Sequence, residues 1–401
     1  MHHHAHWPTF GLVLSCFLAL GLLFGAWQVM ITDLQQALQL SPSTFGLALT
    51  IGVLGSLPAM FLTGRLADKF GARRVMAISC LLMALVVAQL YWVNHYLVLI
   101  SALFLLLGSA GALDVAINAA AVNYEQRTTH KAMSFFHAGY SGGAAASALM
   151  TGYLLSIHVP FRLIYLWIAL GVAVIGLLVL LAKPLDRLIS HPIAQQDNHN
   201  AAQGLAGLFR IPLLMILATI AGLTFFSEGT LEIWSAVYLR LALDLPVLLG
   251  AAGPAIFHIA MMLGRLTAGW VANHFERRKV LLMAGIVAAL GMIVSLSTTY
   301  PPLILLGFLM SGLALAGIVP IVFSLAGGVA PERSGQVISV ITIMGYSGFL
   351  VGPALVGSLA DWLGLRIALL LLIGAGIGIL ILSMRLKQYL PSLSHAKATA
   401  G

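Results

Sequence analysis

The stretch Gly64-Arg-Leu-Ala-Asp68-Lys-Phe-Gly71-Ala-Arg73-Arg74 is a short, strongly charged segment of the chain. Long apolar runs lie on both sides of it, at 43–64 and at 75–93. A helix that spans a bilayer needs roughly 20 mostly apolar residues, so each run is long enough to cross. The stretch therefore predicts a loop between two transmembrane helices, with its basic residues at one membrane surface.

The rest of the 401-residue chain has the same character, with 60% hydrophobic and 8% charged residues. A soluble domain carries about 25% charged residues, and a disordered chain needs low hydrophobicity, so both classes are excluded. The net charge of +8 does not indicate a nucleic-acid partner, because the basic residues lie in short loops between apolar runs. Cys16 and Cys80 lie inside apolar runs and form no metal or disulfide motif. The sequence predicts an all-α membrane protein in a lipid bilayer, without metal or cofactor.

The apolar runs predict twelve transmembrane helices. Their expected ranges are 9–31, 43–64, 75–93, 97–122, 132–157, 161–182, 211–234, 246–271, 279–298, 302–328, 335–359 and 365–386. The longest polar stretch between them, 183–210, divides the helices into six and six. We therefore expect an N-terminal bundle over 1–182, a cytoplasmic linker over 183–210, and a C-terminal bundle with a short tail over 211–401.

The basic residues predict the orientation of these helices. Only Arg162, Arg240 and Arg366 fall on one side of the predicted membrane, whereas the other 17 of the 20 Lys and Arg residues fall on the opposite side. The positive-inside rule places the basic side in the cytoplasm. We expect a multi-pass protein of the inner membrane with both termini in the cytoplasm.

The two halves of the chain repeat each other. The segment Gly64-Arg-Leu-Ala-Asp68-Lys-Phe70 matches Gly269-Trp-Val-Ala-Asn273-His-Phe275 at an offset of 205 residues, and Gly139-Tyr140-Ser141-Gly142 matches Gly345-Tyr346-Ser347-Gly348 at 206. A parallel duplication of six-helix halves is a transporter architecture, with its site between the repeats near the bilayer midplane. A repeat that serves stability alone is the alternative reading.

The segment that begins at Gly64 closely resembles the loop 2–3 signature of the major facilitator superfamily, and the resemblance extends over essentially the whole chain. It implies two pseudo-symmetric six-helix bundles that work by alternating access. In that family, charged residues of this loop lock helices on the cytoplasmic side in one state and release them in another. The resemblance assigns this gate to Gly64, Asp68, Gly71, Arg73 and Arg74. Ordinary topology-setting charge is the alternative.

The second copy of this segment departs from the pattern. It has Asn273 and Glu276 in place of the acid and the second glycine, so a lock there must be weaker or built differently.

Further segments resemble the bacterial sugar-type permeases that are grouped with rhizopine and fucose transporters. They are Asp114-Val-Ala-Ile-Asn118-Ala, Phe136-His137-Ala138, Glu228-Gly229 and Trp234-Ser-Ala-Val-Tyr238-Leu-Arg240. That group commonly has an acid directly before the tryptophan, where this chain has Ile233, with Glu232 one position earlier. One residue turns a helix by about 100°, so the role of that acid does not transfer directly to Glu232.

Ionisable residues inside a membrane are costly and mark functional sites by default. Asp114 and Asn118 share one face of the fourth predicted helix, and His137 lies early in the fifth. We expect Asp114 and His137 to face each other. A carboxylate in a medium of low dielectric constant can hold a proton near neutral pH, and histidine titrates in that range. The set predicts a proton relay or substrate contact, and a structural polar clasp between the two helices is the alternative.

Other polar and aromatic residues are candidates for the cavity lining. Glu228 lies late in the seventh helix and is expected to be membrane-embedded, so it joins the proton or substrate candidates. The weaker candidates are Trp27, Gln28, Tyr140, Glu232, His258 and Tyr346. Trp27 could instead belong to an interfacial belt, His258 to an interhelical hydrogen bond, and the two tyrosines to packing.

The sequence also narrows the function. Arg65 and Arg265 are expected to snorkel at cytoplasmic helix ends, which leaves acids as the deep charges and favours a neutral polyol, a sugar-like compound or a cation. No P-loop occurs, so ATP does not drive the process directly. We expect a monomeric, proton-coupled secondary transporter for a small molecule. The alternatives are a proton-driven exporter of cationic or amphipathic compounds and a transporter-like membrane sensor, whereas an enzyme is not expected.

Overall fold

The computed structural model describes residues 6–128, 131–182, 207–330 and 333–389, and these residues form helices and no strand. The helices are α1 (His6–Ala37), α2 (Pro42–Phe70), α3 (Ala72–Gln89), α4 (Tyr96–Thr128), α5 (Met133–Ser156), α6 (Phe161–Leu181), α9 (Pro212–Val237), α10 (Val247–His274), α11 (Arg277–Leu296), α12 (Pro301–Ala316), α13 (Ile318–Ala326), α14 (Ser334–Leu363), α15 (Leu365–Ala368) and α16 (Leu370–Arg385). Short 3-10 stretches, η2 (Leu90–Trp92) and η7 (Leu386–Gln388), follow α3 and α16, and a π-helical stretch, η5 (Tyr238–Ala242), follows α9. The predicted all-α fold is confirmed.

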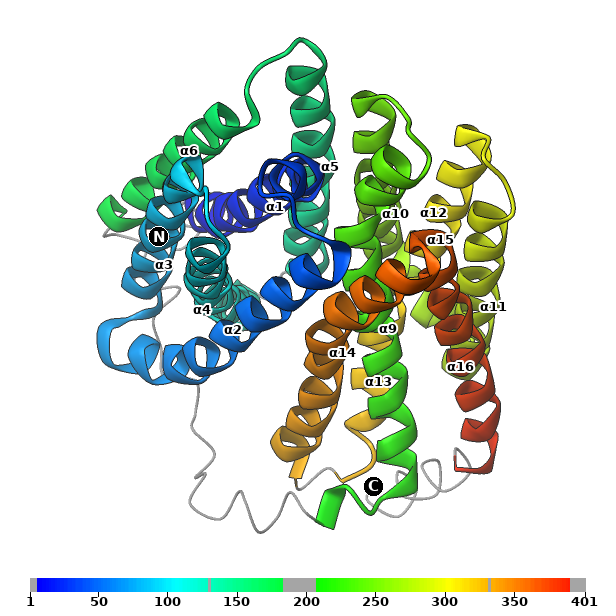
Figure 1. The fold of residues 1–401 in the computed structure, drawn as a ribbon. Helices are drawn as coiled ribbons and strands as arrows, with labels where there is room; N and C mark the ends of the chain where they lie inside the picture. The colour runs from blue at the N-terminus through cyan, green and yellow to red at the C-terminus, as the bar shows by residue number, and fades with distance from the viewer. Residues whose placement is uncertain (1–5, 129–130, 183–206, 331–332, 390–401) are drawn as a thin grey trace.

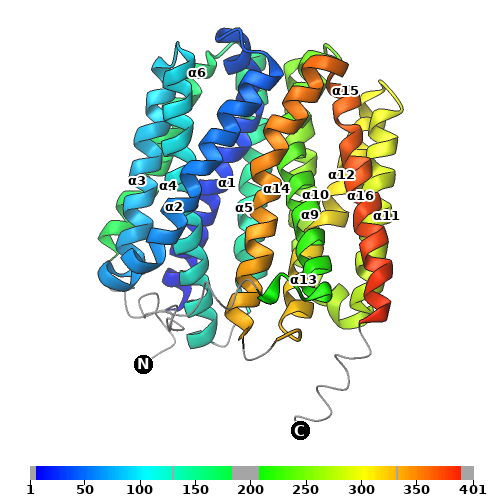
Figure 2. The ribbon, with the colours of Figure 1, turned by 60° about the horizontal axis from the view of Figure 1, so that its bottom comes forward.

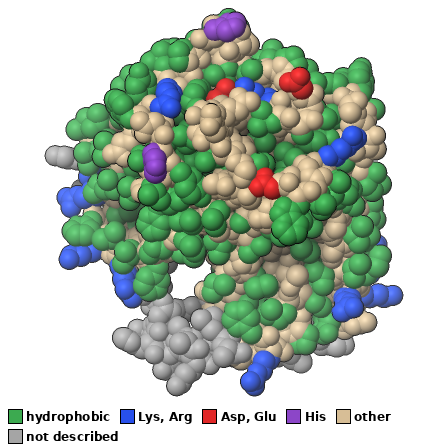
Figure 3. Space-filling view, in the orientation of Figure 1, with side chains coloured by type: hydrophobic (Ala, Val, Ile, Leu, Met, Phe, Trp, Pro, Cys, Tyr) green, Lys and Arg blue, Asp and Glu red, His purple; other side chains and the backbone are tan. Residues whose placement is uncertain are grey.

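Within the described residues, 11 helical segments are long and apolar enough to cross a membrane. The remaining predicted span, 132–157, corresponds to α5, which is 24 residues long but rich in Gly, Ala and Ser. α5 packs along α1 on one side and α10 on the other, so its small residues face helices rather than lipid. Hydrophobic side chains cover most of the face drawn in Figure 3, and few charged ones interrupt them.

The predicted loop at the charged stretch is only one residue long. α2 begins at Pro42 behind the N-cap Ser41, whose hydroxyl accepts a hydrogen bond from the Thr44 N–H. The helix then continues through the charged residues to Phe70, which keeps their backbone N–H and C=O groups hydrogen-bonded. Gly71 ends it with a φ of 86°, and its N–H donates to the Ala67 carbonyl at 2.8 Å. This left-handed conformation favours glycine, which explains the residue type at this position.

Two groups of helices lie side by side (Figure 1). The first group is α1–α6, in which α1 packs along α5, α2 along α4 and α3 along α6. The second group is α9–α16, in which α9 packs along α14, α10 along α12 and α11 along α16. The groups meet where α2 packs on α14 and α5 on α10. α1 begins and α16 ends at the same end of the molecule (Figure 2). We call this the basic end and the opposite one the far end.

Arginines clamp the third and sixth helices of the first group together. At the basic end, Arg73 of α3 is buried and donates to the Val179 carbonyl at 3.3 Å and to the Leu180 carbonyl, both in the last turn of α6. At the far end, Arg162 of α6 donates to the Tyr91 carbonyl in η2 at 2.6 Å. A cation suits the carbonyl end of a helix, where the last C=O groups lack partners.

The second group repeats this clamp. Arg278 of α11, 205 residues after Arg73, donates to the Ser383 carbonyl of α16 at 3.2 Å. Arg366 of α15 donates to the carbonyls of Leu296 at 2.9 Å and Thr298 at 3.2 Å, at the end of α11. The duplication seen in the sequence therefore preserves the same arginine-to-helix-end contacts in both groups.

The clamp predicts a difference in stability between two adjacent arginines. Arg73→Ala removes the donor to two carbonyl groups of α6, and an unsatisfied buried group costs about 1–3 kcal/mol. Arg74 is exposed, so Arg74→Ala is expected to change the free energy of unfolding by less than about 0.5 kcal/mol. Thermal unfolding of the purified variants in detergent measures this difference. Equal losses in both variants would contradict the clamp.

Candidate functional site

Arg265 of α10 lies where the two groups meet. Its Nη1 donates to the Ser141 hydroxyl of α5 at 2.6 Å and to the His137 carbonyl at 3.4 Å. Its Nη2 lies 3.9 Å from a carboxylate oxygen of Glu228 in α9, and the two side chains are only 20% and 9% exposed. The expectation that Arg265 snorkels at a helix end is wrong. Its long side chain instead reaches a hydroxyl and a carboxylate between the helices.

His258 of α10 links α1 to α9 and α10 of the second group. Its Nε2 lies 2.9 Å from the Gln28 Oε1 of α1 and 4.0 Å from a carboxylate oxygen of Glu232 in α9. An amide oxygen only accepts, so His258 Nε2 donates this bond. His258 and Gln28 are both 1% exposed, and His258 Nδ1 finds no partner among the described residues. Gln28, Glu232 and His258 therefore form one polar chain across the two groups.

Asp114 of α4 reaches the second group through Tyr346 of α14, whose hydroxyl donates to it at 3.4 Å. Asn118, one turn along α4, donates to the Asp114 carboxylate at 3.0 Å and to its backbone carbonyl at 2.8 Å. The described residues show no hydrogen bond or ion pair between Asp114 and His137. The His137 ring instead lies edge-on to Phe17 of α1, at 5.2 Å between ring centroids. The geometry thus pairs Asp114 with Tyr346 rather than with His137.

The central charges are unbalanced. Arg265 lies beside one carboxylate, that of Glu228, whereas in the described part of the chain Asp114 is held by Asn118 and Tyr346, and Glu232 lies near His258. One guanidinium neutralises one carboxylate. The other two need protons or a bound ligand to lose their charge in a medium of low dielectric constant. These residues, with Gln28, Tyr140, Ser141, His258 and Tyr346, are called the central cluster below.

The aromatic candidates separate into two places. Tyr140 of α5 lies in the central cluster, with its ring 6.0 Å from the Arg265 guanidinium and 6.0 Å from the His258 ring. Trp27 is 5% exposed and packs against Tyr165 of α6 at 6.3 Å. It therefore lies inside the first group rather than between the groups.

The residues of the predicted gate motif lie at the basic end, where α2 ends and α3 begins. Gly71 makes the turn and Arg73 binds the end of α6, as described above. A Cβ at Gly64 would meet nothing within 4 Å, and Arg74 is exposed. The side chain of Asp68 lies outside the described part of the structure. In this structure Arg73 thus serves packing within the first group.

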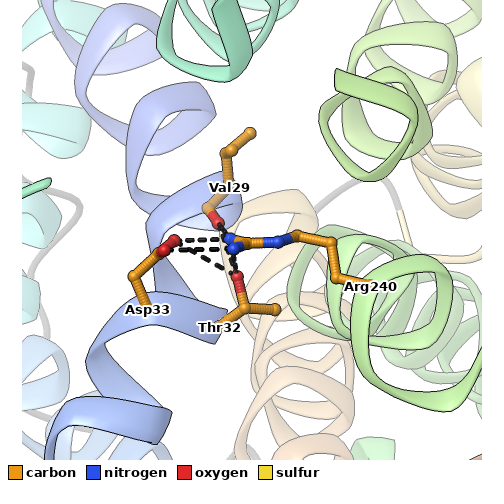
Figure 4. Close-up of polar contacts among 4 residues, drawn as sticks. All are labelled: Val29, Thr32, Asp33 and Arg240. Carbon is orange, nitrogen blue, oxygen red and sulfur yellow. Dashed lines mark hydrogen bonds and ion pairs between the residues drawn. The ribbon is translucent and has the colours of Figure 1, made fainter. Parts of the chain in front are cut away.

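A further cross-group contact lies at the far end and was not predicted from the sequence. Arg240 of η5 forms a fork with Asp33 of α1, with distances of 2.5 Å from Nη1 to Oδ2 and 3.1 Å from Nη2 to Oδ1 (Figure 4). It also donates to the Thr32 hydroxyl and to the Val29 carbonyl at 3.5 Å. Two parallel bonds to a carboxylate are among the stronger polar contacts in proteins. A signal was present in the sequence, since Arg240 is one of three basic residues on the far side.

The far ends of α2 and α14 also lie close together. The Ser43 backbone N–H donates to an Asp361 carboxylate oxygen at 3.3 Å, and the Ser43 hydroxyl donates to the same oxygen. Deeper in the bundle, the Thr50 hydroxyl donates to the Leu350 carbonyl at 2.9 Å. A Cβ at Gly46 would collide with the Pro353 carbonyl, so glycine permits this approach. Together with the Arg240 fork, these contacts close the far end between the two groups.

Comparison with known proteins places this geometry in a family. The family model described as Major Facilitator Superfamily matches residues 12–272 and 254–400. An uncharacterized MFS-type transporter of Yersinia pestis is 30% identical over 356 residues, which cover 88% of this chain and 89% of that protein. Membrane protein MosC of Rhizobium meliloti is 27% identical over 358 residues, covering 89% and 85% of the two chains.

Solved structures show the same fold. The nucleoside transporter NupG superposes with a TM-score of 0.79 at 15% identity, covering 94% of this chain and 99% of that one. The fucose:proton symporter FucP of E. coli superposes with a TM-score of 0.64 at 19% identity, covering 95% and 99%. At these identities the likeness concerns the arrangement of helices.

The Arg240 fork predicts that its loss opens the far end. A charge-assisted hydrogen bond contributes about 1.5–3 kcal/mol, so Arg240→Ala is expected to raise the open fraction about tenfold or more. A cysteine introduced as Thr50→Cys, labelled with a membrane-impermeant thiol reagent, measures the opening as a faster labelling rate.

Arg162→Ala is the matched control, because Arg162 is also a far-end arginine but donates within its own group. It is expected to leave the labelling rate unchanged. An unchanged rate in Arg240→Ala would show that the fork does not hold the far end closed.

Proposed function

Because the chain belongs to the major facilitator superfamily, we propose that it moves a small polar solute, sugar-like or a polyol, across the inner membrane. It is a multi-pass membrane transporter, and its Yersinia pestis relative is named as a transporter rather than an enzyme. The proposed driving force is a proton gradient, and the proposed mechanism is alternating access by a monomer.

The central cluster is the observation that supports this proposal. It gathers polar side chains from α4 and α5 of the first group and from α9, α10 and α14 of the second, together with Gln28 of α1. Hydroxyl, amide, carboxylate and guanidinium groups suit the hydroxyl groups of a polyol, which both donate and accept. A site between two helix groups is where transporters of this architecture bind their solutes.

In this proposal the moving bodies are residues 1–182 and 211–401, joined by 183–210. The far-end contacts of Asp33, Ser43 and Thr50 keep the solute from reaching the cluster from that side. The basic end faces the cytoplasm by the positive-inside rule. The structure then corresponds to a state closed to the outside, and the opposite state requires breaking the Arg240 fork.

The proposed proton carriers are the acids of the cluster. Asp114 lies between Asn118 and Tyr346, which hold its carboxylate by neutral donors, so it is free to gain or lose a proton without losing a cation partner. Glu228 is paired with the Nη2 of Arg265, so its protonation would release Nη2 to the solute while Nη1 stays on Ser141. The fold is similar to that of FucP, which is named as a fucose:proton symporter, and this similarity supports the proposed proton coupling.

The excess of carboxylates supports a second candidate, the export of cationic or amphipathic compounds. Among the residues that the structure describes, two acids of the cluster have no Lys or Arg partner, and a cationic solute would neutralise one of them. A thermal-shift screen of the purified protein separates the two candidates, with neutral sugars and polyols in one set and organic cations in the other. Stabilisation by the neutral set alone would exclude the second candidate, and stabilisation by cations alone would exclude the first.

Asp114→Asn tests the coupling. Asparagine keeps the size of the side chain but cannot exchange a proton, so solute accumulation driven by a pH gradient is expected to fall more than tenfold in proteoliposomes. Exchange of solute at equal concentration on both sides, which needs no net proton transfer, is expected to persist. The protein is expected to stay folded, as judged by its thermal unfolding.

Ser227→Ala is the control, because Ser227 neighbours Glu228 but its hydroxyl donates to the Leu223 carbonyl of its own helix. It is expected to accumulate solute normally. Full accumulation by Asp114→Asn would exclude Asp114 as the proton carrier and leave Glu228 and Glu232 to be tested in the same way.

A further inference from the structure

A groove of about 440 Å³ lies outside the central cluster, among α10, α11, α12 and α13. Its volume falls within the range of known ligand pockets, about 300–1,000 Å³. The lining residues are Gly264, Thr267, Ala268, Val271, Phe275, Lys279, Val280, Met283, Ala284, Val287, Leu313, Ala314, Gly317 and Ile321. The Thr267 hydroxyl donates back to the Leu263 carbonyl of its own helix at 2.9 Å, so Lys279 is the charged group of the lining. The groove is therefore apolar along its length and charged at one end.

A break in the tenth span creates the groove. α12 packs closely on both α10 and α11, and a Cβ at Gly264 would lie 2.5 Å from the Ala316 Cβ. The helix stops at Gly317, and α13 then makes few contacts with α10 or α11. The space that opens beyond the break is the groove.

The groove opens to the outer surface of the second group rather than to the contact between the groups. Leu313, Met283 and Phe275 are 42%, 56% and 54% exposed, and α11 and α12 lie at the rim of the molecule (Figure 1). In a membrane, an apolar outer surface of this kind faces lipid. From Gly264 of α10 to Phe275, the residue just past its end, the groove follows eleven steps along the chain, which is about 16 Å at 1.5 Å per step. One leaflet contributes about 15 Å of hydrocarbon, so the groove has the length of one leaflet.

The charged end lies at the basic end of the molecule. Arg277 and Lys279 occupy the first turn of α11, and both are exposed. Arg278 between them is engaged with the Ser383 carbonyl, and Glu276 pairs with Lys279 at 3.4 Å. An exposed pair of this kind contributes little, and the segment keeps an excess of positive charge. Basic pockets between helices on the cytoplasmic side suit anionic lipid headgroups.

We propose that this groove binds an anionic phospholipid, with one acyl chain along α10 and α11 and the phosphate against Arg277 and Lys279. The match of groove length to one leaflet places the headgroup at the level of these two side chains. The small residues Ala268, Ala284 and Ala314 make room for the chain. The proposal does not depend on the identity of the transported solute.

Native mass spectrometry of the full chain tests the site. The protein in detergent is mixed with equal amounts of dioleoylphosphatidylglycerol and dioleoylphosphatidylcholine, and the retained lipid is counted. We expect a severalfold preference for the anionic lipid. Ala314→Phe and Ala268→Phe fill the groove and are each expected to reduce the retained lipid at least fivefold. The double variant Arg277→Gln with Lys279→Gln is expected to keep lipid but to lose the preference.

Two controls sit elsewhere on the surface. Gly171→Phe adds a ring on α6, where a Cβ meets nothing within 4 Å, and Lys131→Gln removes an exposed basic residue of the first group. Both are expected to bind lipid as the unaltered protein does. Equal retention of the two lipids by the unaltered protein, or unchanged binding in both groove-filling variants, would overturn the proposal. If those variants fail to fold, the double variant decides the matter through its lipid preference.

Discussion

An arginine inside an apolar bundle must have acceptors, because an unpaired charge in a medium of low dielectric constant is prohibitively costly. This constraint organises the structure. Arg73 and Arg162 satisfy it on carbonyl groups within the first group, and Arg278 and Arg366 do so within the second. These contacts join the third and sixth helices of each group at both ends. Each group is thereby a body held together by contacts that do not depend on the other.

Arg240 and Arg265 satisfy the same constraint across the boundary, where their partners include carboxylates and not only the helix-end carbonyl groups that the clamps bind. The Arg240 and Asp33 side chains are 11% and 18% exposed, and the Arg265 guanidinium stands 3.9 Å from Glu228. These contacts join the two groups, whereas each clamp joins helices of one group, so the groups can separate without breaking a clamp. Two rigid bodies joined by exchangeable polar contacts are what a rocking transition between two states requires.

The sequence predicted the helices well because the length of an apolar run is a direct consequence of bilayer thickness. It could not predict which side chains meet. The break at Gly317 was hidden inside one apolar run, 302–328, since lipid solvates both sides of it equally. The expected meeting of Asp114 and His137 depended on which helices are neighbours, and Phe17 of α1 occupies the place beside His137. Arg265 was misplaced because helix position fixes the Cα and not the reach of a long side chain.

The duplication helps to tell polar residues of the site from polar residues of the scaffold, which the composition cannot do. The clamp arginines have counterparts in the other half, Arg73 with Arg278 at an offset of 205 residues and Arg162 with Arg366 at 204, and they serve the scaffold that both halves share. Tyr140 and Tyr346 of the cluster also correspond to each other, but its charged residues and His258 lack such counterparts. Glu228, His258 and Arg265 stand opposite Leu23, Val53 and Met60 at an offset of 205 residues. A costly polar group that only one half retains does not serve the shared scaffold. Departure from the repeat thus separates the ionisable residues of the site from the arginines of the fold, and it does so from the sequence once the offset is known.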